Sequence, residues 1–292
     1  MIRNFFNGIA IGIVEIIPGV SAGTIAILLG FYDKLIKSIN HFTEDYKKHL
    51  KFFIPLGFGV IAGLLMFSSL ITYLLTNYSF PTMTFFMGLI VGLIPIIYCK
   101  VIKPDERLKI SEAFLVIVPI IILAIIANLR TGIVINPTEM INNISPAMMI
   151  FILIAGMLAA AALIIPGISG SFVLLILGIY PLAIYALSSI STYLRDLANT
   201  GLLLNISQVL IPLGIGVVIG GLSMARVIEK LLQNHHKKLY LVILGLLTGS
   251  VYALSKEPIV FQSEMTTMIV TVGVLTFVAG SILSYQLGKK KI

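Results

Sequence analysis

The segment EIIPGVSAGT, residues 15–24, places a Pro-Gly turn, an acidic side chain and two hydroxyls inside an apolar stretch. A near-copy, LIIPGISGSF, occupies residues 163–172, so that Pro18 and Pro166 lie 148 positions apart. Pro and Gly both interrupt helices, and an interrupted helix leaves backbone N–H and C=O groups without partners. At membrane depth such groups are tolerated only where protein buries them or a polar cavity wets them. The two turns therefore indicate a functional site.

The composition is that of an all-α integral membrane protein. The 292 residues are 58% hydrophobic and 11% charged, whereas a soluble domain is about 25% charged. The net charge of +8 does not indicate a nucleic-acid partner, because the Lys and Arg residues lie in short loops between apolar segments, as the positive-inside rule predicts for cytoplasmic loops. The single cysteine, Cys99, excludes an internal disulfide, and we expect it to be buried near a helix end.

Six apolar segments are long enough to cross the bilayer, which takes about 20 residues of helix. They are residues 52–75, 81–98, 113–129, 208–225, 239–254 and 267–287. Two longer segments, 5–36 and 148–187, are each interrupted by Pro-Gly. Split at the turn, the first gives two pieces of about 14 and 15 residues that would each reach only roughly 20 Å. We therefore expect each segment to form a re-entrant helical hairpin.

The order of segments predicts an internal repeat, with a hairpin and three transmembrane helices in each half. PLGFGVIAG from Pro55 matches PLGIGVVIG from Pro212, and MGLIVG from Met87 matches LGLLTG from Leu244. We expect the Gly-x-Gly pairs in the first motif to serve close helix packing. The predicted repeats are residues 1–130 and 146–292, joined by a polar linker at 131–145.

The distribution of basic residues predicts that the two repeats have inverted topology. In the first half the loops after the hairpin and after the second span are rich in Lys, whereas the loop at 76–79 carries no charge. In the second half the pattern inverts: the loop after the hairpin has one Arg, Arg195, the next loop is basic, the one after it has only Lys256, and the chain ends in three lysines. This pattern puts both termini in the cytoplasm. The hairpins then enter from opposite sides, and their tips meet near the middle of the membrane.

The hairpin tips carry the candidate binding residues. A helix that begins after each Pro-Gly turn offers free N–H donors and a partial positive charge, which favour an anion such as phosphate. The glycines let a ligand approach the backbone and the hydroxyls add donors; these residues are Gly19, Ser21, Gly23, Thr24, Gly167, Ser169, Gly170 and Ser171. The alternative is a packing turn, with Ser as the N-cap and Gly for close helix contact.

Two charged residues extend this candidate site. Glu15 has Leu163 as its counterpart, and an acidic group at membrane depth is costly and usually functional. We expect Glu15 to carry a proton or bind a sodium ion, the alternative being that it holds freed backbone N–H groups. Arg226 could attract a phosphate headgroup or act as an interfacial anchor, and the same choice applies to Arg130.

The sequence argues against an enzyme. GISG at residues 167–170 resembles the nucleophile motif of rhomboid-type intramembrane proteases, but that chemistry needs a histidine base near the serine. The four histidines, His41, His49, His235 and His236, all lie in polar loops. The adjacent pair His235-His236 lacks nearby Cys or Asp, so we expect no metal site and no other cofactor. An ion channel remains an alternative.

The two signatures resemble those of a known family. PGVSAGTIAILLGFYDKLI, residues 18–36, and IIPGISGSFVLLILGIY, residues 164–180, are similar to the two motifs of the PopT family of bacterial polyprenyl-phosphate transporters, with Ala22 where the family usually has Gly. The resemblance implies transport of undecaprenyl phosphate across the cytoplasmic membrane, back to the inner face for reuse in cell-wall synthesis. It implies that the headgroup lies against Ser21, Gly23, Thr24, Ser169, Gly170 and Ser171, and that Glu15 couples transport to an ion.

By this resemblance the partners are the polyprenyl-phosphate lipid and the bilayer, and alternating access would come from one half rocking against the other. Spacing alone does not separate this function from a secondary transporter or channel for a small anion. The sequence also leaves the oligomeric state open, with a homo-oligomer as one option.

Overall fold

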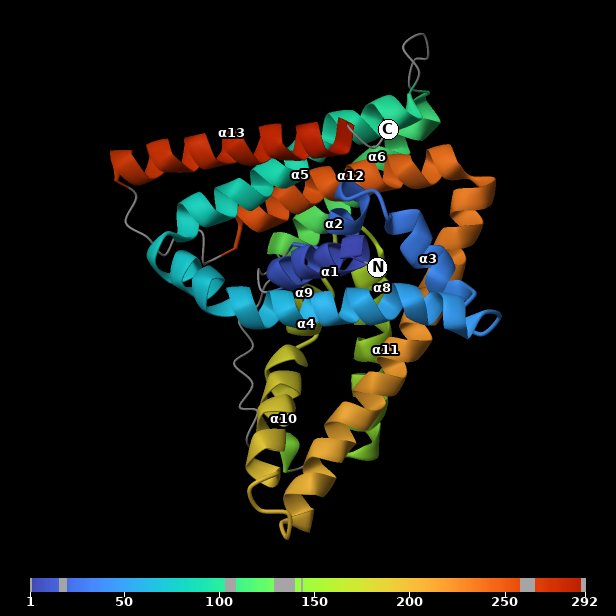
Figure 1. The fold of residues 1–292 in the computed structure, drawn as a ribbon, viewed down its shortest axis with the longest axis vertical. Helices are drawn as coiled ribbons and strands as arrows, with labels where there is room; N and C mark the ends of the chain where they lie inside the picture. Colours follow the sequence, from blue (N-terminus) through green and yellow to red (C-terminus); the bar gives the residue numbers. More distant parts are fainter. Residues whose placement is uncertain are drawn as a thin grey trace. The chain divides into compact units, whose positions relative to one another are not determined.

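The computed structural model describes residues 2–15, 20–102, 109–128, 140–142, 144–257 and 266–289. All the regular elements in these ranges are helices, which confirms the predicted all-α class (Figure 1). In the first half they are α1 (Ile2–Glu15), α2 (Ala22–Leu28), α3 (Tyr32–Asn40), α4 (Tyr46–Asn77), α5 (Ser79–Val101) and α6 (Ile110–Asn128). In the second half they are α8 (Pro146–Ile164), α9 (Gly170–Ile176), α10 (Tyr180–Tyr193), α11 (Thr200–Asn234), α12 (His236–Ser255) and α13 (Thr267–Lys289).

Among the described residues, seven helices are long and apolar enough to cross a membrane: α4, α5, α6, α8, α11, α12 and α13. Six of them coincide with the six predicted spans, because each is one uninterrupted apolar run. The most apolar windows of α4, α6, α11 and α13 are only 17 to 22% buried within the protein. Exposed apolar surface on this scale is what the hydrocarbon of a bilayer covers. The protein is therefore a multi-pass membrane protein.

The chain divides into two compact units. Unit 1 comprises Met1–Leu129, Ile165–Ile168 and Ala225–Ile292, and unit 2 comprises Arg130–Ile164 and Ser169–Met224. The core of unit 2 includes Ile152, Leu182 and Val209, and it also takes in Ile141, which is 2% exposed. Ile141 lies in the predicted linker at 131–145, most of which falls outside the described residues. This division differs from the predicted sequence halves, which remain a prediction.

Equivalent glycines make equivalent helix contacts in the two halves. In unit 1 a Cβ on Gly59 of α4 would collide with the carbonyl oxygen of Phe5 in α1. In unit 2 a Cβ on Gly216 of α11 would collide with that of Leu153 in α8. The predicted packing role of the Gly-x-Gly pairs is therefore confirmed for the second glycine of each pair. It is wrong for the first, because a Cβ on Gly57 or Gly214 would meet nothing within 4 Å.

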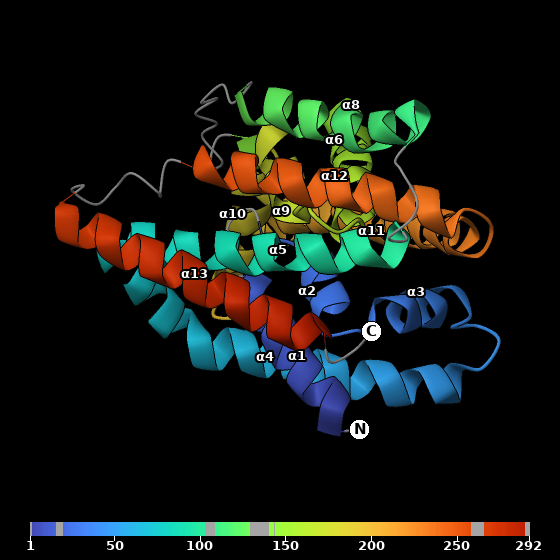
Figure 2. The same ribbon diagram turned by 90° about the horizontal axis from the view of Figure 1, so that it is seen from above.

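Within unit 1, the last two long helices of each half pack against helices of the other half. Gly88 of α5 packs against the backbone of Phe277 in α13, and its counterpart Gly245 of α12 packs against Val116 in α6. In Figure 2, α5 and α13 run close together, and α12 lies beside α6. An exchange of this kind is what a two-fold relation between the repeated segments produces. Inversion of the repeats across the membrane remains a prediction.

The second arm of each predicted hairpin is broken, contrary to the expectation of one continuous piece. Gly30 and Gly178 have φ angles of 67° and 72°. At each, the glycine and the residue after it donate N–H bonds back to the carbonyls of the preceding turn, the arrangement that ends a helix at a left-handed glycine. The helical segments Gly170–Ile176 and Tyr180–Ile190 consequently meet at an angle of 112°.

Two further expectations need correction. The first arm of the second hairpin, α8, has 19 residues and is long and apolar enough to span the membrane, which is longer than the short arms expected of a re-entrant hairpin; the re-entrant course remains a prediction. Cys99 lies near the end of α5 as expected, but its side chain is exposed. A small apolar residue near a helix end of a membrane protein need not be buried in protein, because it can face lipid.

Candidate functional site

The first turn leads into a helix whose start is held by protein side chains. Pro18 and Gly19 lie outside the described residues. Ser21 is the N-cap of α2: its backbone is extended, and its hydroxyl accepts the N–H of Gly23 over 3.2 Å. The carboxylate of Glu15, the last residue of α1, interacts with the N–H of Ala22. The packing interpretation of the turn is therefore correct for Ser21, which caps the helix. Glu15 also holds a backbone N–H, which is the alternative role considered for it.

The second turn, Ile165–Ile168, lies in unit 1 against the start of α2. The N–H of Gly167 donates to Oγ1 of Thr24 over 3.0 Å, and the hydroxyl of Ser21 donates to the carbonyl of Ile165 over 3.4 Å. Ser21 and Thr24 are 1% and 2% exposed, so these bonds form away from solvent. These two bonds show that the second turn contacts the start of α2, which follows the first turn. That the tips meet near the middle of the membrane remains a prediction.

Two glycines of the second motif are explained by packing. Gly167 has a φ of +92°, and a Cβ there would lie 2.9 Å from the carbonyl carbon of Leu246 in α12. In unit 2, a Cβ on Gly170 would lie 2.7 Å from the carbonyl oxygen of Ala159 in α8. At both positions the space left by the missing side chain is filled by another helix. A role for these glycines in ligand approach remains a prediction.

The second motif also carries a hydroxyl pair. Ser169 and Ser171 lie at the start of α9, and their oxygens are 2.8 Å apart. Ser169 occupies the N-cap position without making a side-chain capping bond, in contrast to Ser21. Ser169 is 3% exposed. The two hydroxyls of the second motif thus bond to each other, and the Ser169 hydroxyl does not cap the start of α9.

The remaining predicted residues differ in their surroundings. Gly23 is buried in the first turn of α2, Arg226 is exposed on α11, and Arg130 lies outside the described residues. Within the described ranges, the chain brings together no group of three His, Cys, Asp or Glu side chains that could hold a metal.

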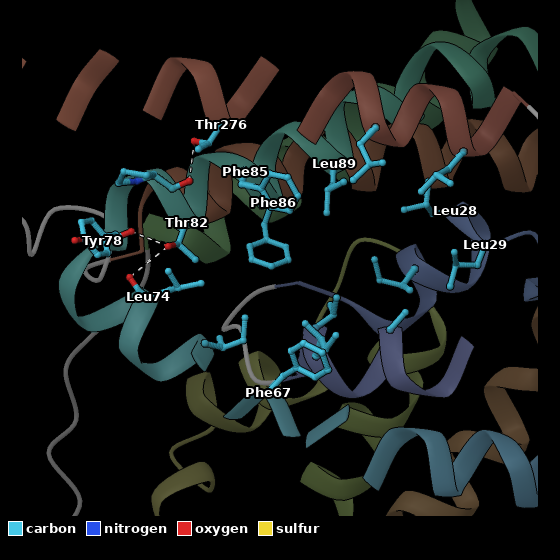
Figure 3. A pocket seen from close by; sticks show the side chains of 18 of the residues that line it. Leu28, Leu29, Phe67, Leu74, Tyr78, Thr82, Phe85, Phe86, Leu89 and Thr276 are labelled. Carbon is cyan, nitrogen blue, oxygen red and sulfur yellow. Dashed lines mark hydrogen bonds between the residues drawn. The ribbon is translucent and has the colours of Figure 1, made fainter. Parts of the chain in front are cut away.

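Two cavities in unit 1 were not anticipated. One, of about 600 Å³, is bounded by apolar side chains of α1, α2, α4, α5 and α13 (Figure 3). The other, of about 520 Å³, lies between the start of α1 and the α3–α4 region, and four of its lining residues are Lys34, Lys37, Lys48 and Lys51. The clustering of these lysines in the sequence was a signal for the second cavity. No sequence pattern indicated the first.

Comparison with known proteins assigns the family. Residues 11–274 match the sequence model of a family described as undecaprenyl phosphate translocase-like. The chain belongs to this family. A polyprenyl-phosphate transporter of Staphylococcus aureus is 33% identical over 288 residues, which cover 98% of this chain and 95% of that protein. A polyprenyl-phosphate transporter of Vibrio cholerae is 29% identical over 263 residues, or 85% of this chain and 76% of that protein. No solved structure matches the chain.

Proposed function

We propose that this protein moves a polyprenyl phosphate, undecaprenyl phosphate in particular, across the bacterial cytoplasmic membrane. In this proposal the lipid returns to the inner face, where cell-wall synthesis uses it again. The family and the names of both relatives support the substrate. The membrane-spanning helices support transport rather than a soluble activity.

The observation that carries the proposal is the contact between the two turns. Two hydrogen bonds cross between the motifs at buried side chains: the N–H of Gly167 donates to the hydroxyl oxygen of Thr24, and the hydroxyl of Ser21 donates to the carbonyl of Ile165. Phosphate oxygens are stronger acceptors than the neutral oxygens now used, because charge-assisted hydrogen bonds are roughly twice as strong. A phosphate that reached this contact would exchange protein–protein bonds for protein–phosphate bonds without leaving buried donors unsatisfied.

The headgroup residues we propose are those of the two motifs. In unit 1 they are Ser21, Gly23, Thr24 and Gly167, together with Gly19, which lies outside the described residues. Ser169, Gly170 and Ser171 follow Gly167 closely in the sequence and complete the proposed set. Arg226 stays in the set because its exposed cationic side chain, in the part of α11 that belongs to unit 1, could bind the phosphate headgroup.

Glu15 is the residue we propose for ion coupling. Its carboxylate lies beside the N–H of Ala22 at the start of α2, the helix that also bears Thr24. A proton or a sodium ion on this carboxylate would remove its negative charge from the neighbourhood of an arriving phosphate. Binding of the ion and binding of the phosphate would then favour each other through electrostatics.

We place the end of unit 1 that carries α3 in the cytoplasm, together with both termini. Several lysine-bearing segments are tied together at this end. Lys237 at the start of α12 pairs with Glu112 at the start of α6 over 2.7 Å. Asn40 at the end of α3 donates to Glu229 of α11 over 2.7 Å. Figure 2 shows α3 and the turn between α11 and α12 toward the same side. A concentration of positive charge at one end favours a cytoplasmic location.

We propose transport without covalent chemistry. Acyl or phosphoryl transfer by a serine requires a base within hydrogen-bond reach. The hydroxyl of Ser169 bonds to that of Ser171 over 2.8 Å, and the hydroxyl of Ser21 donates to the backbone carbonyl of Ile165. Neither hydroxyl has a histidine among these partners.

The test uses proteoliposomes that contain labelled undecaprenyl phosphate. We expect the protein to accelerate exchange of the lipid between leaflets over protein-free liposomes, and we expect no uptake of inorganic phosphate into the same vesicles. Uptake of inorganic phosphate without lipid movement would instead support a transporter or channel for a small anion. The extracted lipid should be chemically unchanged, as shown by mass spectrometry.

A further inference from the structure

The apolar cavity of unit 1 has the chemistry of a hydrocarbon site. Its lining residues are Ala, Val, Ile, Leu, Phe and Pro, with one Tyr and two Thr. Both threonine hydroxyls are already satisfied: Thr82 donates to the carbonyl of Tyr78 over 2.7 Å and Thr276 to that of Pro81 over 2.8 Å. Figure 3 shows these bonds at one end of the cavity, with Phe86 and Leu89 reaching into it from α5. A polar ligand would therefore find no free donor among these two hydroxyls.

The cavity is elongated and opens at the surface. Along α13 its lining runs from Val272 to Leu287, which is roughly 22 Å at the rise of an α-helix. Three lining residues are substantially exposed: Tyr78 at 50%, Leu283 at 43% and Val272 at 37%. Since α4 and α13 are spans whose apolar surfaces are mostly exposed, a chain already in the bilayer could enter from the side. The volume of about 600 Å³ lies within the range of small-molecule pockets, about 300–1,000 Å³.

In unit 1, two residues that line the cavity are sequence neighbours of proposed site residues. Val14, which lines it, precedes Glu15, and Ile25, which also lines it, follows Thr24. The lining on α1 and α2 therefore lies next in the sequence to residues that we propose for the coupled ion and the phosphate. A molecule with a phosphate at one end and a long apolar chain fits this continuity, whereas a free anion has nothing to place in the cavity.

We infer that this cavity binds the isoprenoid chain of the substrate, specifically the units nearest the phosphate. This inference rests on the proposed function and adds a tail site to its headgroup site. Apolar burial is non-directional and proportional to area, so the cavity supplies affinity while the turns supply orientation. The remainder of the chain stays in the bilayer.

The test exploits the absence of tryptophan from the chain. Phe67→Trp places the protein's one indole fluorophore in the cavity, and Phe114→Trp places it on α6, where Phe114 is 60% exposed. Both variants are reconstituted in brominated phosphatidylcholine, whose bromines quench indole fluorescence. We expect a small mole fraction of undecaprenyl phosphate to relieve the quenching of Phe67→Trp and to leave that of Phe114→Trp unchanged. The same mole fraction of unbrominated phosphatidylglycerol should relieve neither.

Three outcomes would overturn the tail site. In the first, undecaprenyl phosphate fails to relieve the quenching of Phe67→Trp. In the second, it relieves the quenching of both variants equally. In the third, phosphatidylglycerol relieves the quenching of Phe67→Trp as strongly as undecaprenyl phosphate. The last result would make the cavity a site for ordinary acyl chains. The wild-type protein is assayed for lipid exchange in parallel. Exchange without protection of Phe67→Trp refutes the tail site alone, whereas the absence of exchange refutes the proposed function.

Discussion

The backbone N–H of Gly167 donates to the side-chain oxygen of Thr24 over 3.0 Å, and this bond joins the two motifs through residues 143 positions apart. Both residues are buried, and Gly167 holds a backbone conformation that residues with a side chain rarely adopt. The bond joins the interrupted backbone of one motif to the start of α2 in the other. It is therefore both a structural tie and, in our proposal, the position at which a phosphate would intervene.

Thr24→Val should destabilise the protein because it removes the acceptor of the Gly167 N–H and keeps the shape of the side chain. A buried donor left unsatisfied costs about 1–3 kcal/mol. Thr24→Ser retains the oxygen and should lie close to the wild type. Thermal unfolding in detergent, followed by circular dichroism, measures the difference. Equal stability of the Val and Ser variants would show that the bond contributes little.

Gly59→Ala should disrupt the packing of α1 on α4, since the new methyl group would collide with the carbonyl oxygen of Phe5. Overpacking of this kind costs about 1–3 kcal/mol. Gly57→Ala is the matched control, because its Cβ meets nothing within 4 Å.

The second half offers the same comparison in Gly216→Ala and Gly214→Ala. Expression level and thermal unfolding should drop for the Gly59 and Gly216 variants only. A loss of the same size in the controls would mean that helix propensity or lipid contact, rather than this contact, sets the stability.

Glu15→Gln should abolish the dependence of lipid exchange on a pH gradient if Glu15 carries the coupled proton. The Gln side chain is neutral at every pH and imitates the protonated carboxyl, so the variant should behave at all pH values as the wild type does at low pH. Exchange is measured from about pH 5 to pH 9, the range over which the charge of a perturbed carboxyl changes. A variant that keeps the wild-type pH profile would remove Glu15 from the coupling mechanism, and a wild type that responds only to sodium would identify the other ion.

The proposed orientation predicts the sidedness of labelling. In a Cys99→Ser background, Lys48→Cys should react with a membrane-impermeant maleimide from the cytoplasmic side, and Asn77→Cys should react from the outside. Both positions are exposed and lie at opposite ends of α4. Inside-out vesicles and intact cells supply the two sides. The reverse result would invert the topology while leaving the fold unchanged.

The elements that the sequence predicts best are those encoded by local patterns. The six long spans are uninterrupted apolar runs, and the repeated Pro-Gly motif at Pro18 and Pro166 identifies segments that meet in the structure. The breaks at Gly30 and Gly178 were missed because one glycine in an apolar run is compatible with a continuous helix. Their signal was present, since Gly30-Phe31-Tyr32 recurs as Gly178-Ile179-Tyr180.

Other features depend on which segments pack together. The pairing of Gly88 with Phe277 joins helices from opposite halves, and an apolar pattern does not specify which apolar partner a helix takes. The apolar cavity of unit 1 was missed for the same reason, because five helices surround it and the sequence does not show which helices pack together. Ser21 caps α2, as the packing interpretation predicts, and it also contacts the second turn. Its role in phosphate binding remains a prediction.

The most direct test of the central claim is the rate at which undecaprenyl phosphate exchanges between leaflets in proteoliposomes that contain the double variant Ser21→Ala/Ser169→Ala. Ser69→Ala, at an exposed position of α4, serves as the control, and size-exclusion profiles establish that all variants fold. The account predicts wild-type exchange for the control and a rate near that of protein-free liposomes for the double variant. Wild-type exchange by a correctly folded double variant would contradict the assignment of the headgroup to the two turns.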